Sequence, residues 1–419
     1  MTKVITYGTY DLLHYGHIRL LERAKALGDY LVVGVTSDDF DKSRGKINNQ
    51  QSLIERIAAI KETGIADEII VEEYEGQKID DIKRYGIDIF TVGSDWKGKF
   101  DYLSEYCKVI YLDRTEGVSS SGIRAEQRML KVSSDNIRNV EKKFIREAGF
   151  VNGVEFSKDE YDAKYIVSMP ENHYSEVKKE LENGKSVICE SPITCNASQT
   201  KELFQLAKQN KCFLFDGLKT AYATAFSRML LLVKSGKIGN VVSIDATCTS
   251  MADFNESDDI ENKWNSICSW GPVAMLPIFQ IFGVNYTDKR IATKYLDKEK
   301  KFDAFTKIDF TYPNAVASIK VAKKAKSEGE LIITGTKGYI VVPAPWWKTD
   351  YFEVRYENPQ DNKRYFYQLD GEGIRYEIAA FAKSVSSMKN YANVPVEVSI
   401  AISKVIEDFY NGNVVEIKS

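Results

Sequence analysis

The chain has 419 residues, which is too long for one ordinary domain and predicts two or three. Its 57 Lys and Arg residues nearly balance 60 Asp and Glu residues, and the net charge of -3 excludes the basic surplus typical of nucleic-acid or anionic-membrane binding. A hydrophobic content of 43% excludes a disordered chain. We therefore expect a folded protein whose partners are small molecules or proteins, with no nucleic acid and no membrane among them.

Histidine is scarce, since only His14, His17 and His173 occur. The six Cys residues form no C-x-x-C pair and no zinc-type spacing with His, so we expect no protein-built metal site. The N-terminus meets Asp and His too early for the apolar core of a signal peptide. The longest apolar stretch, residues 272–283, is shorter than the about 20 residues that a membrane-spanning helix needs. We expect a cytoplasmic protein.

From Lys3 onward, short β-rich runs alternate with helical ones. The β-rich runs are VITYG, YLVVGVT, DEIIVEE, IDIFTVGSD and KVIYLDR, and they are separated by helical runs such as GHIRLLERAKALGD and SLIERIAAIKET. Strands that alternate with helices predict a parallel sheet with helices on both faces. Ligands of such sheets bind at the carboxyl ends of the strands. The loops that follow the strands are therefore the candidate binding loops.

The first candidate loop, GTYDLLHYGHIRLLERA, follows the opening strand directly. It places His14, Gly16 and His17 at the start of an amphipathic helix. Free backbone N–H groups and the positive end of the helix dipole favour a phosphate there. Two imidazoles beside it could donate hydrogen bonds to phosphate oxygens as charge develops on them. Alternatively, the two histidines only cap the helix.

The second candidate loop, DRTEGVSSSGIRAE, follows the last of these strands. Arg114 can make bidentate contacts to a phosphate, and Ser119, Ser120 and Ser121 supply hydroxyl groups before a helix predicted to start near Gly122. The alternative is an ordinary capped helix. Because both loops follow strands of one parallel sheet, together they favour a phosphate-binding site.

Three separated motifs carry a resemblance to a known family. YGTYDLLHYGH, GSDWKGKFDYL and DRTEGVSSS occur in the order and spacing of the glycerol-3-phosphate cytidylyltransferases of the wall teichoic acid type, within the HxGH nucleotidyltransferase superfamily. The resemblance covers residues 1 to about 126. One departure is the run of serines where the family commonly has threonines. The resemblance implies transfer of CMP from CTP to a glycerol phosphate or another polyol phosphate, with release of pyrophosphate and with Mg²⁺ bound alongside CTP.

The same resemblance implies the site residues. The catalytic candidates are His14, His17, Lys46 and Arg114. The nucleotide-binding candidates are Thr9, Tyr10, Gly16, Asp95, Trp96, Thr115, Ser119 and Ser120. Two alternatives stay open: Lys46 could be a solvated lysine of a charged loop, and Arg56 could either point into the site or pack on the sheet. No aromatic cage for choline is evident, which favours a glycerol-type substrate.

The rest of the chain divides at a change of pattern. We predict three domains, namely a cytidylyltransferase domain at 1–130, an incomplete Rossmann-like domain at 131–240 and an α+β domain at 241–419. The fold class is therefore α/β, with a Rossmann-like parallel sheet, an incomplete Rossmann-like segment and an open antiparallel sheet. Such an open sheet can carry a cofactor face or a subunit interface, and we expect a homodimer.

Six motifs in the rest of the chain carry a second resemblance, namely MPENHY, NGKSVICESP, DGLKTAY, SGKIGNVVSIDA, FTYPNAVASI and ITGTKGYIVV. Through them, residues from about 131 to 419 resemble the glucose-fructose oxidoreductase, inositol dehydrogenase and rhizopine catabolism group of NAD(P)-dependent enzymes. The resemblance makes 131–240 a truncated dinucleotide-binding-like domain and 241–419 an oxidoreductase C-terminal-like α+β domain. The resemblance implies an NAD(P) site and a catalytic lysine in a Glu-Lys-Pro motif.

The departures from this family count against NAD(P) and ordinary hydride chemistry. Asp135 to Arg138 stand where the glycine-rich loop belongs, and only glycine lets the backbone approach the pyrophosphate. The second strand and its acidic ribose ligand are missing from the pattern between Gly153 and Asp162. Ser191 replaces the catalytic lysine, and no His follows position 173. Lys219 could act as a substitute proton donor and His173 could contact a ligand, or both are structural.

Three hypotheses follow. The first is a CTP:glycerol-phosphate cytidylyltransferase that makes CDP-glycerol, or another CDP-polyol, for teichoic acid or capsule polysaccharide, with an inactive oxidoreductase-like region used in dimerisation. The second is a bifunctional enzyme that also reduces a keto precursor with NAD(P)H. The third is a nucleotide-sensing module without catalysis.

Overall fold

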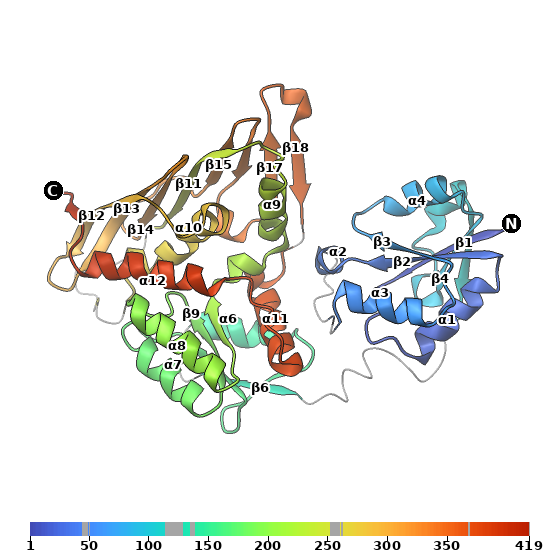
Figure 1. The fold of residues 1–419 in the computed structure, drawn as a ribbon, viewed down its shortest axis with the longest axis horizontal. Helices are drawn as coiled ribbons and strands as arrows, with labels where there is room; N and C mark the ends of the chain where they lie inside the picture. The colour runs from blue at the N-terminus through green and yellow to red at the C-terminus, as the bar shows by residue number, and fades with distance from the viewer. Residues whose placement is uncertain are drawn as a thin grey trace. The chain divides into compact units, whose positions relative to one another are not determined.

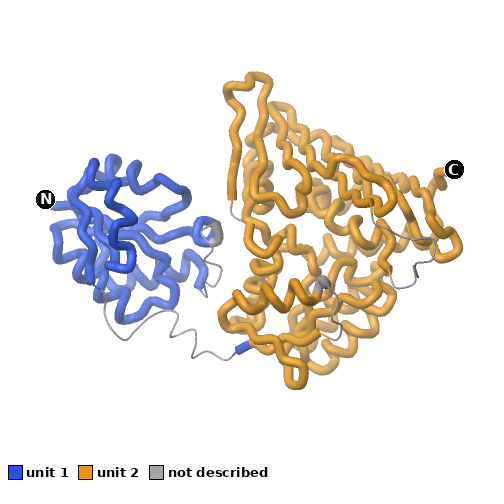
Figure 2. Tube along the Cα trace, turned by 180° about the vertical axis from the view of Figure 1, so that it is seen from behind, with its two compact units in different colours: residues 1–129 blue, residues 130–419 orange. Residues whose placement is uncertain are grey.

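A computed structural model of the protein describes residues 1–43, 49, 51–113, 129–134, 139–251, 260, 263–367 and 369–418. The chain forms two compact units, Met1–Met129 and Leu130–Ser419 (Figure 2). The further boundary near residue 240 stays a prediction. Within the described residues, no helix combines the length and the apolar character needed to cross a bilayer.

The first unit alternates strands with helices, as the pattern predicts. Its elements are β1 Lys3–Gly8, α1 Tyr15–Lys25, β2 Tyr30–Thr36, α2 Asp38–Ser43, α3 Leu53–Glu62, β3 Glu68–Glu72, α4 Gln77–Tyr85, β4 Ile89–Gly93, η1 Ser94–Trp96, η2 Asp101–Glu105 and β5 Lys108–Leu112. The five strands form one sheet in the order β3-β2-β1-β4-β5, and every neighbouring pair is parallel. The predicted parallel sheet is confirmed.

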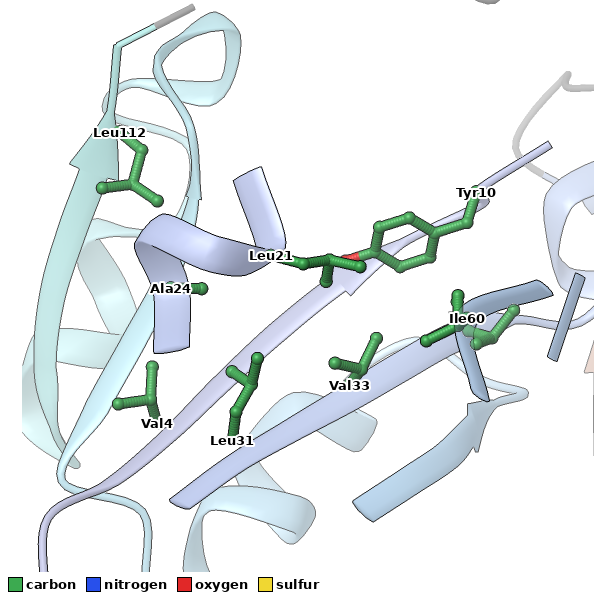
Figure 3. Packing of buried hydrophobic residues seen from close by; sticks show 9 residues of the cluster. Val4, Tyr10, Leu21, Ala24, Leu31, Val33, Ile60 and Leu112 are labelled. Atoms are coloured by element: carbon green, nitrogen blue, oxygen red, sulfur yellow. The ribbon is translucent and has the colours of Figure 1, made fainter. Parts of the chain in front are cut away.

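Helices cover both faces of this sheet. Successive side chains of a strand point to opposite faces, so neighbouring residues of β1 pack in different core clusters. Val4 packs with Leu21 of α1 and Ile60 of α3 in one core cluster (Figure 3). Its neighbour Ile5 packs in a second cluster with Ile82 of α4. The buried strands therefore read as continuous apolar runs rather than as alternating ones.

The strand order places two loops side by side. β1 lies at the point where the order reverses, with β2 on one side and β4 on the other. In open α/β sheets, ligands bind in the crevice outside the carboxyl ends of the strands at such a point. The loop that begins after Gly8 and the turn that begins after Gly93 flank this crevice.

The second unit opens with another five-stranded parallel sheet. Its elements are β6 Leu130–Ser133, α6 Asn139–Ala148, β7 Val154–Phe156, β8 Ala163–Ile166, α7 His173–Glu182, β9 Ser186–Glu190, α8 Ala197–Gln209, β10 Leu214–Gly217, η3 Lys219–Tyr222 and α9 Thr224–Lys234. The strand order is β10-β9-β8-β6-β7. The expectation that the second strand is missing is wrong, because β7 pairs in parallel with β6. A strand of three residues is too short to show an alternating pattern in the sequence.

A nine-stranded sheet follows. Its elements are β11 Val241–Thr249, α10 Ser266–Phe282, β12 Asp288–Asp297, β13 Phe302–Tyr312, β14 Ala315–Ala322, β15 Leu331–Gly335, β16 Tyr339–Val342, η5 Trp346–Lys348, β17 Tyr351–Arg355, η6 Pro359–Asp361, β18 Lys363–Phe366, η7 Gly371–Gly373, α11 Ile374–Ser387, α12 Val396–Tyr410 and β19 Val415–Glu416. The order is β18-β17-β16-β15-β11-β14-β13-β12-β19. Helix α10 packs against β11, β13 and β14 (Figure 1).

This sheet is mixed, which corrects the prediction of an antiparallel sheet. β11 pairs in parallel with β14, and β12 pairs in parallel with β19, whereas the other neighbours are antiparallel. The chain leaves the sheet after β11, passes through α10 and returns through β12 and β13 before it reaches β14. Alternation along a strand identifies the buried face but carries no information on the direction of the neighbouring strand.

Candidate active site

His14 caps the helix that follows β1. Its backbone is extended, with φ -127° and ψ 172°, and its Nδ1 accepts a hydrogen bond of 3.1 Å from the backbone N–H of Gly16. The first turn of α1 contains no acidic side chain. In the neutral imidazole this hydrogen bond assigns the proton to Nε2, because an accepting Nδ1 carries none. His14 is therefore oriented by the helix that it caps, with a donor at the other ring nitrogen.

His17 lies directly against His14. The two rings are stacked, with centroids 3.8 Å apart and planes 18° from parallel. Tyr10 meets His17 edge-on at 5.6 Å between ring centroids. The four-residue motif thus brings both imidazoles together at the N-terminus of α1, as the sequence predicts.

Tyr10 departs from its predicted role as a nucleotide-binding residue. Its side chain is 2% exposed and belongs to the core cluster that contains Leu21 and Val33 (Figure 3). Its backbone is left-handed, with φ 53°, and a Cβ on Gly8 would lie 2.9 Å from its ring. The ring therefore supports His17 from the core side instead of lining a ligand.

Thr9 is held by a buried charge network that the sequence does not reveal. Its Oγ1 donates to Asp41 Oδ1 at 3.0 Å. The fully buried Arg56 donates to the carbonyl oxygens of Thr9 at 2.6 Å and Thr36 at 2.9 Å, and it is paired with Asp38. Arg56 thus packs within the fold and ties together the segments that follow β1 and β2. Asp41 has no motif around it, and only its place after a buried strand could have marked it.

Asp95 and Trp96 lie in the short turn η1 that follows β4. Asp95 is exposed, and Trp96 is half-buried against Phe100, with ring centroids 5.8 Å apart. Since β4 neighbours β1, this turn lies beside the histidine loop at the carboxyl edge of the sheet. The predicted nucleotide contacts of both residues stay predictions.

Five predicted site residues lie outside the described residues, namely Lys46, Arg114, Thr115, Ser119 and Ser120. The segment that precedes four of them is described. The carbonyl oxygen of Asp113, directly after β5, accepts a hydrogen bond of 2.8 Å from Arg23 of α1. The chain therefore leaves β5 beside the helix that carries His17.

In the second unit, the structure places His173 in the core. Its ring is fully buried, with Nδ1 2.9 Å from the carbonyl oxygen of Pro192 and Nε2 3.1 Å from that of Ser168. Burial lowers the pKa of this imidazole, so the neutral form is favoured. Both nitrogens face the backbone, which corrects the suggestion that His173 contacts a ligand.

The residues around the Glu-Ser-Pro motif form a buried acidic group. Glu190 is partly buried and accepts a hydrogen bond of 2.5 Å from Tyr165, whereas Asp216 and Glu377 are buried. Burial raises the pKa of Asp216 to about 6 and that of Glu377 well above its usual range. Lys219 lies near this group, and its Nζ is 2.7 Å from Glu372. The predicted loop at Asp135 to Arg138 lies outside the described residues.

Comparison with known proteins assigns the first unit. Residues 5–140 match the cytidylyltransferase-like family model. A stretch of 130 residues is 50% identical to glycerol-3-phosphate cytidylyltransferase of Bacillus spizizenii, and it covers 31% of this chain and 100% of that enzyme. The corresponding enzyme of Staphylococcus aureus is 46% identical over 126 residues, which cover 30% of this chain and 95% of the relative.

The second unit has relatives of a different kind. Residues 127–218 match the oxidoreductase family with an NAD-binding Rossmann fold. Trans-1,2-dihydrobenzene-1,2-diol dehydrogenase of Oryctolagus cuniculus is 23% identical over 301 residues, 68% of this chain and 90% of the relative. A 3-ketoreductase from Actinomadura kijaniata, solved in complex with NADP, superposes with a TM-score of 0.56 at 14% identity over 69% of this chain and 99% of that one. The likeness to solved structures shows the fold alone.

These matches agree with the histidine pair at the reversal point of the first sheet and with the two parallel sheets of the chain. Through its first unit the chain belongs to the glycerol-3-phosphate cytidylyltransferase family, and it is a nucleotidyltransferase fused to an oxidoreductase-like unit.

Proposed function

We propose that the first unit transfers CMP from CTP to a glycerol phosphate, and that the CDP-glycerol serves the synthesis of teichoic acid or capsule polysaccharide. The observation that carries this proposal is the stacked pair His14 and His17 at the N-terminus of α1. It lies within a stretch that is 50% identical to a glycerol-3-phosphate cytidylyltransferase over that enzyme's full length. Glycerol 3-phosphate is the favoured acceptor, because the relatives are named glycerol-3-phosphate cytidylyltransferases.

In this reaction a phosphate oxygen of the acceptor attacks the α-phosphorus of CTP, and the bond from that phosphorus to the β-phosphate oxygen breaks. Pyrophosphate leaves with the electron pair of this bond, and no covalent enzyme intermediate forms. The protein therefore acts by positioning and by stabilising charge. The Nε2–H of His14 and the ring of His17 supply donors where charge builds on the phosphate oxygens.

Mg²⁺ would arrive with the triphosphate and neutralise part of its charge. Mg²⁺ commonly binds through substrate phosphates and one or two carboxylates rather than in an all-protein cage. The exposed Asp95 beside β1 is a carboxylate that could reach such an ion.

We propose that the second unit does not carry out NAD(P)-dependent hydride transfer. The segment between β6 and the end of α6 contains no glycine in the sequence, and the serine at position 191 cannot replace an ammonium group as proton donor. We propose dimerisation as the role of this unit, because an open sheet can carry a subunit interface. The test is a comparison of oligomeric state by sedimentation between the full chain and residues 1–130. A dimer that persists in residues 1–130 alone would contradict this role.

The central test is pyrophosphate release from CTP with sn-glycerol 3-phosphate, glycerol 2-phosphate and longer polyol phosphates. We expect turnover with a glycerol phosphate, and His17→Ala should lower kcat by roughly 10²–10³-fold, as removal of one transition-state donor does. Arg19→Ala is the matched control, because Arg19 lies on the exposed side of the same helix and pairs with Glu22. The absence of turnover with every polyol phosphate, together with retained CTP binding, would favour the sensing alternative.

A further inference from the structure

Three lysines of the second unit converge on one carboxylate. The Nζ of Lys219 lies 2.7 Å from Glu372 Oε2, while those of Lys143 and Lys348 lie 3.3 Å and 3.4 Å from Oε1. They come from distant parts of the chain, namely η3, α6 and η5, and Glu372 lies in η7. The side chains are 30% to 51% exposed, so solvent reaches the cluster. Three ammonium groups thus meet one carboxylate at Glu372, and Lys219 also interacts with the acidic residues Glu190 and Glu377.

The backbone at Glu372 is strained. Its φ is 55°, a left-handed conformation that costs a non-glycine residue roughly 1–2 kcal/mol. It lies between Gly371 and Gly373, which have φ values of 56° and 92°. A Cβ at Gly371 would lie 2.1 Å from Glu147, and one at Gly373 would lie 2.8 Å from the carbonyl oxygen of Lys219. The loop is thus closely packed around the turn that presents the carboxylate to the lysines.

The charge of Glu372 is firmly maintained. Burial raises its pKa, but Lys219, Lys348 and Lys143 outweigh burial and lower that pKa to about 2. The carboxylate of Glu147, which lies against Gly371, is engaged by Arg375 at 2.9 Å. The three lysines therefore surround an anion that the protein itself supplies.

We propose that Lys143, Lys219 and Lys348 form a binding site for a phosphate monoester or inorganic phosphate, and that Glu372 is an internal occupant that such a dianion displaces. Lysine ammonium groups bind phosphate as compact charges, and three of them within 3.4 Å of two carboxylate oxygens suit the terminal oxygens of a phosphate. Because three ammonium groups meet at one monoanionic carboxylate, a dianion is favoured over a second carboxylate. This site lies wholly in the second unit and does not depend on the cytidylyltransferase reaction.

The test is isothermal titration of the full chain with inorganic phosphate, sn-glycerol 3-phosphate and glycerol at pH 8 and constant ionic strength. A phosphate monoester is a dianion at this pH because its second pKa is about 6. Phosphate binding in the first unit is common to all variants, so only differences between variants count. A larger gain in affinity of the Glu372→Gln protein for glycerol 3-phosphate than for inorganic phosphate identifies a phosphate monoester site, and an equal gain for both identifies a site for free phosphate.

Glu372→Gln removes the internal occupant and should raise phosphate affinity roughly tenfold, which corresponds to a change of one charge interaction near a protein surface. Glu353→Gln is the matched control, since Glu353 is also held by two cations, Arg355 and Arg364. The double variant Glu372→Gln with Lys348→Gln should lose this gain in phosphate affinity. If that double variant does not fold, Lys143→Gln is combined with Glu372→Gln instead of Lys348→Gln. Equal phosphate affinity of the Glu372→Gln and Glu353→Gln proteins, or a gain that survives loss of the lysine, would overturn the proposal.

Discussion

At the scale of single residues, Arg56 shows how burial determines the role of a side chain. The sequence leaves open whether it points into the site or packs on the sheet. The structure shows a fully buried guanidinium that donates to the carbonyl oxygens of Thr9 and Thr36 and faces Asp38 and Asp41. It is a positioning residue, because it acts on the histidine loop through the backbone of Thr9.

Arg56→Met should therefore destabilise the first unit by about 3–5 kcal/mol, because it removes the cation beside the fully buried Asp41 and the donor to the carbonyl oxygens of Thr9 and Thr36. Urea unfolding followed by circular dichroism measures this loss. Arg19→Met removes an exposed ion pair with Glu22 and should cost less than about 1 kcal/mol. Equal losses in the two variants would show that the Arg56 network contributes no more than a surface pair.

Asp216 provides a prediction on pH. Its folded-state pKa of about 6 lies above the ordinary value of 3.8 because the carboxyl group is buried. The protonated form is favoured in the fold, so stability present below pH 4 is lost as the pH rises through 6. Asp216→Asn should therefore stabilise the second unit at pH 7.5 by up to about 3 kcal/mol, with the gain shrinking towards pH 4. Denaturant unfolding at the two pH values checks this, and a gain independent of pH would contradict it.

The residue scale also shows what could be predicted of the site. His14 and His17 were found because their spacing at a helix start has a chemical meaning, and the structure brings their rings together. Asp41 was missed because a buried aspartate next to an arginine has no sequence pattern of its own. Tyr10 was misplaced because the motif places its backbone in the loop, whereas the left-handed φ of that backbone directs the ring into the core.

At the scale of elements, α3 begins with a capping box. Ser52 accepts a hydrogen bond from the backbone N–H of Glu55, whose side chain accepts one from the backbone N–H of Ser52. This cap fixes the start of the helix that carries Arg56. Local chemistry of this kind is visible in the sequence, which is why the helix was predicted with nearly its observed bounds.

Ser52→Ala should destabilise the first unit by about 1 kcal/mol, the usual cost of losing an N-cap. Ser52→Thr should retain most of the stability, because threonine also forms the capping box. The midpoints of urea unfolding distinguish the two variants. An equal loss in both would show that the side-chain hydroxyl group does not cap α3 in solution.

Other elements could not be predicted from local patterns. The three-residue β7 is too short for its pattern to be recognised, yet it completes the sheet by pairing with β6. The parallel pairing of β11 with β14 depends on the path of the chain through α10, which alternation within a strand does not record. Strand direction and order arise from long-range pairing.

At the scale of the whole molecule, each unit has a core of its own. Residues 1–130 should therefore fold alone and release pyrophosphate from CTP with a kcat within an order of magnitude of the full chain. The Bacillus spizizenii relative supports this expectation, because 130 matched residues cover all of that enzyme. A pyrophosphate assay on the shortened chain checks it, and a folded but inactive fragment would contradict the independence of the first unit.

By itself, the sequence determined the parallel sheet of the first unit, the change of pattern near residue 130, the family of the first unit and the pair of histidines that opens its first helix. These features depend on local spacing and on motifs that remain contiguous in the chain. Only the tertiary structure decided which charged groups meet. The fold brings Arg56 close to Asp41, and it brings Lys143, Lys219 and Lys348 close to Glu372. These partners lie far apart in the sequence. Electrostatic energy depends on the distance between charges and on their burial, and neither quantity can be read from the order of the residues.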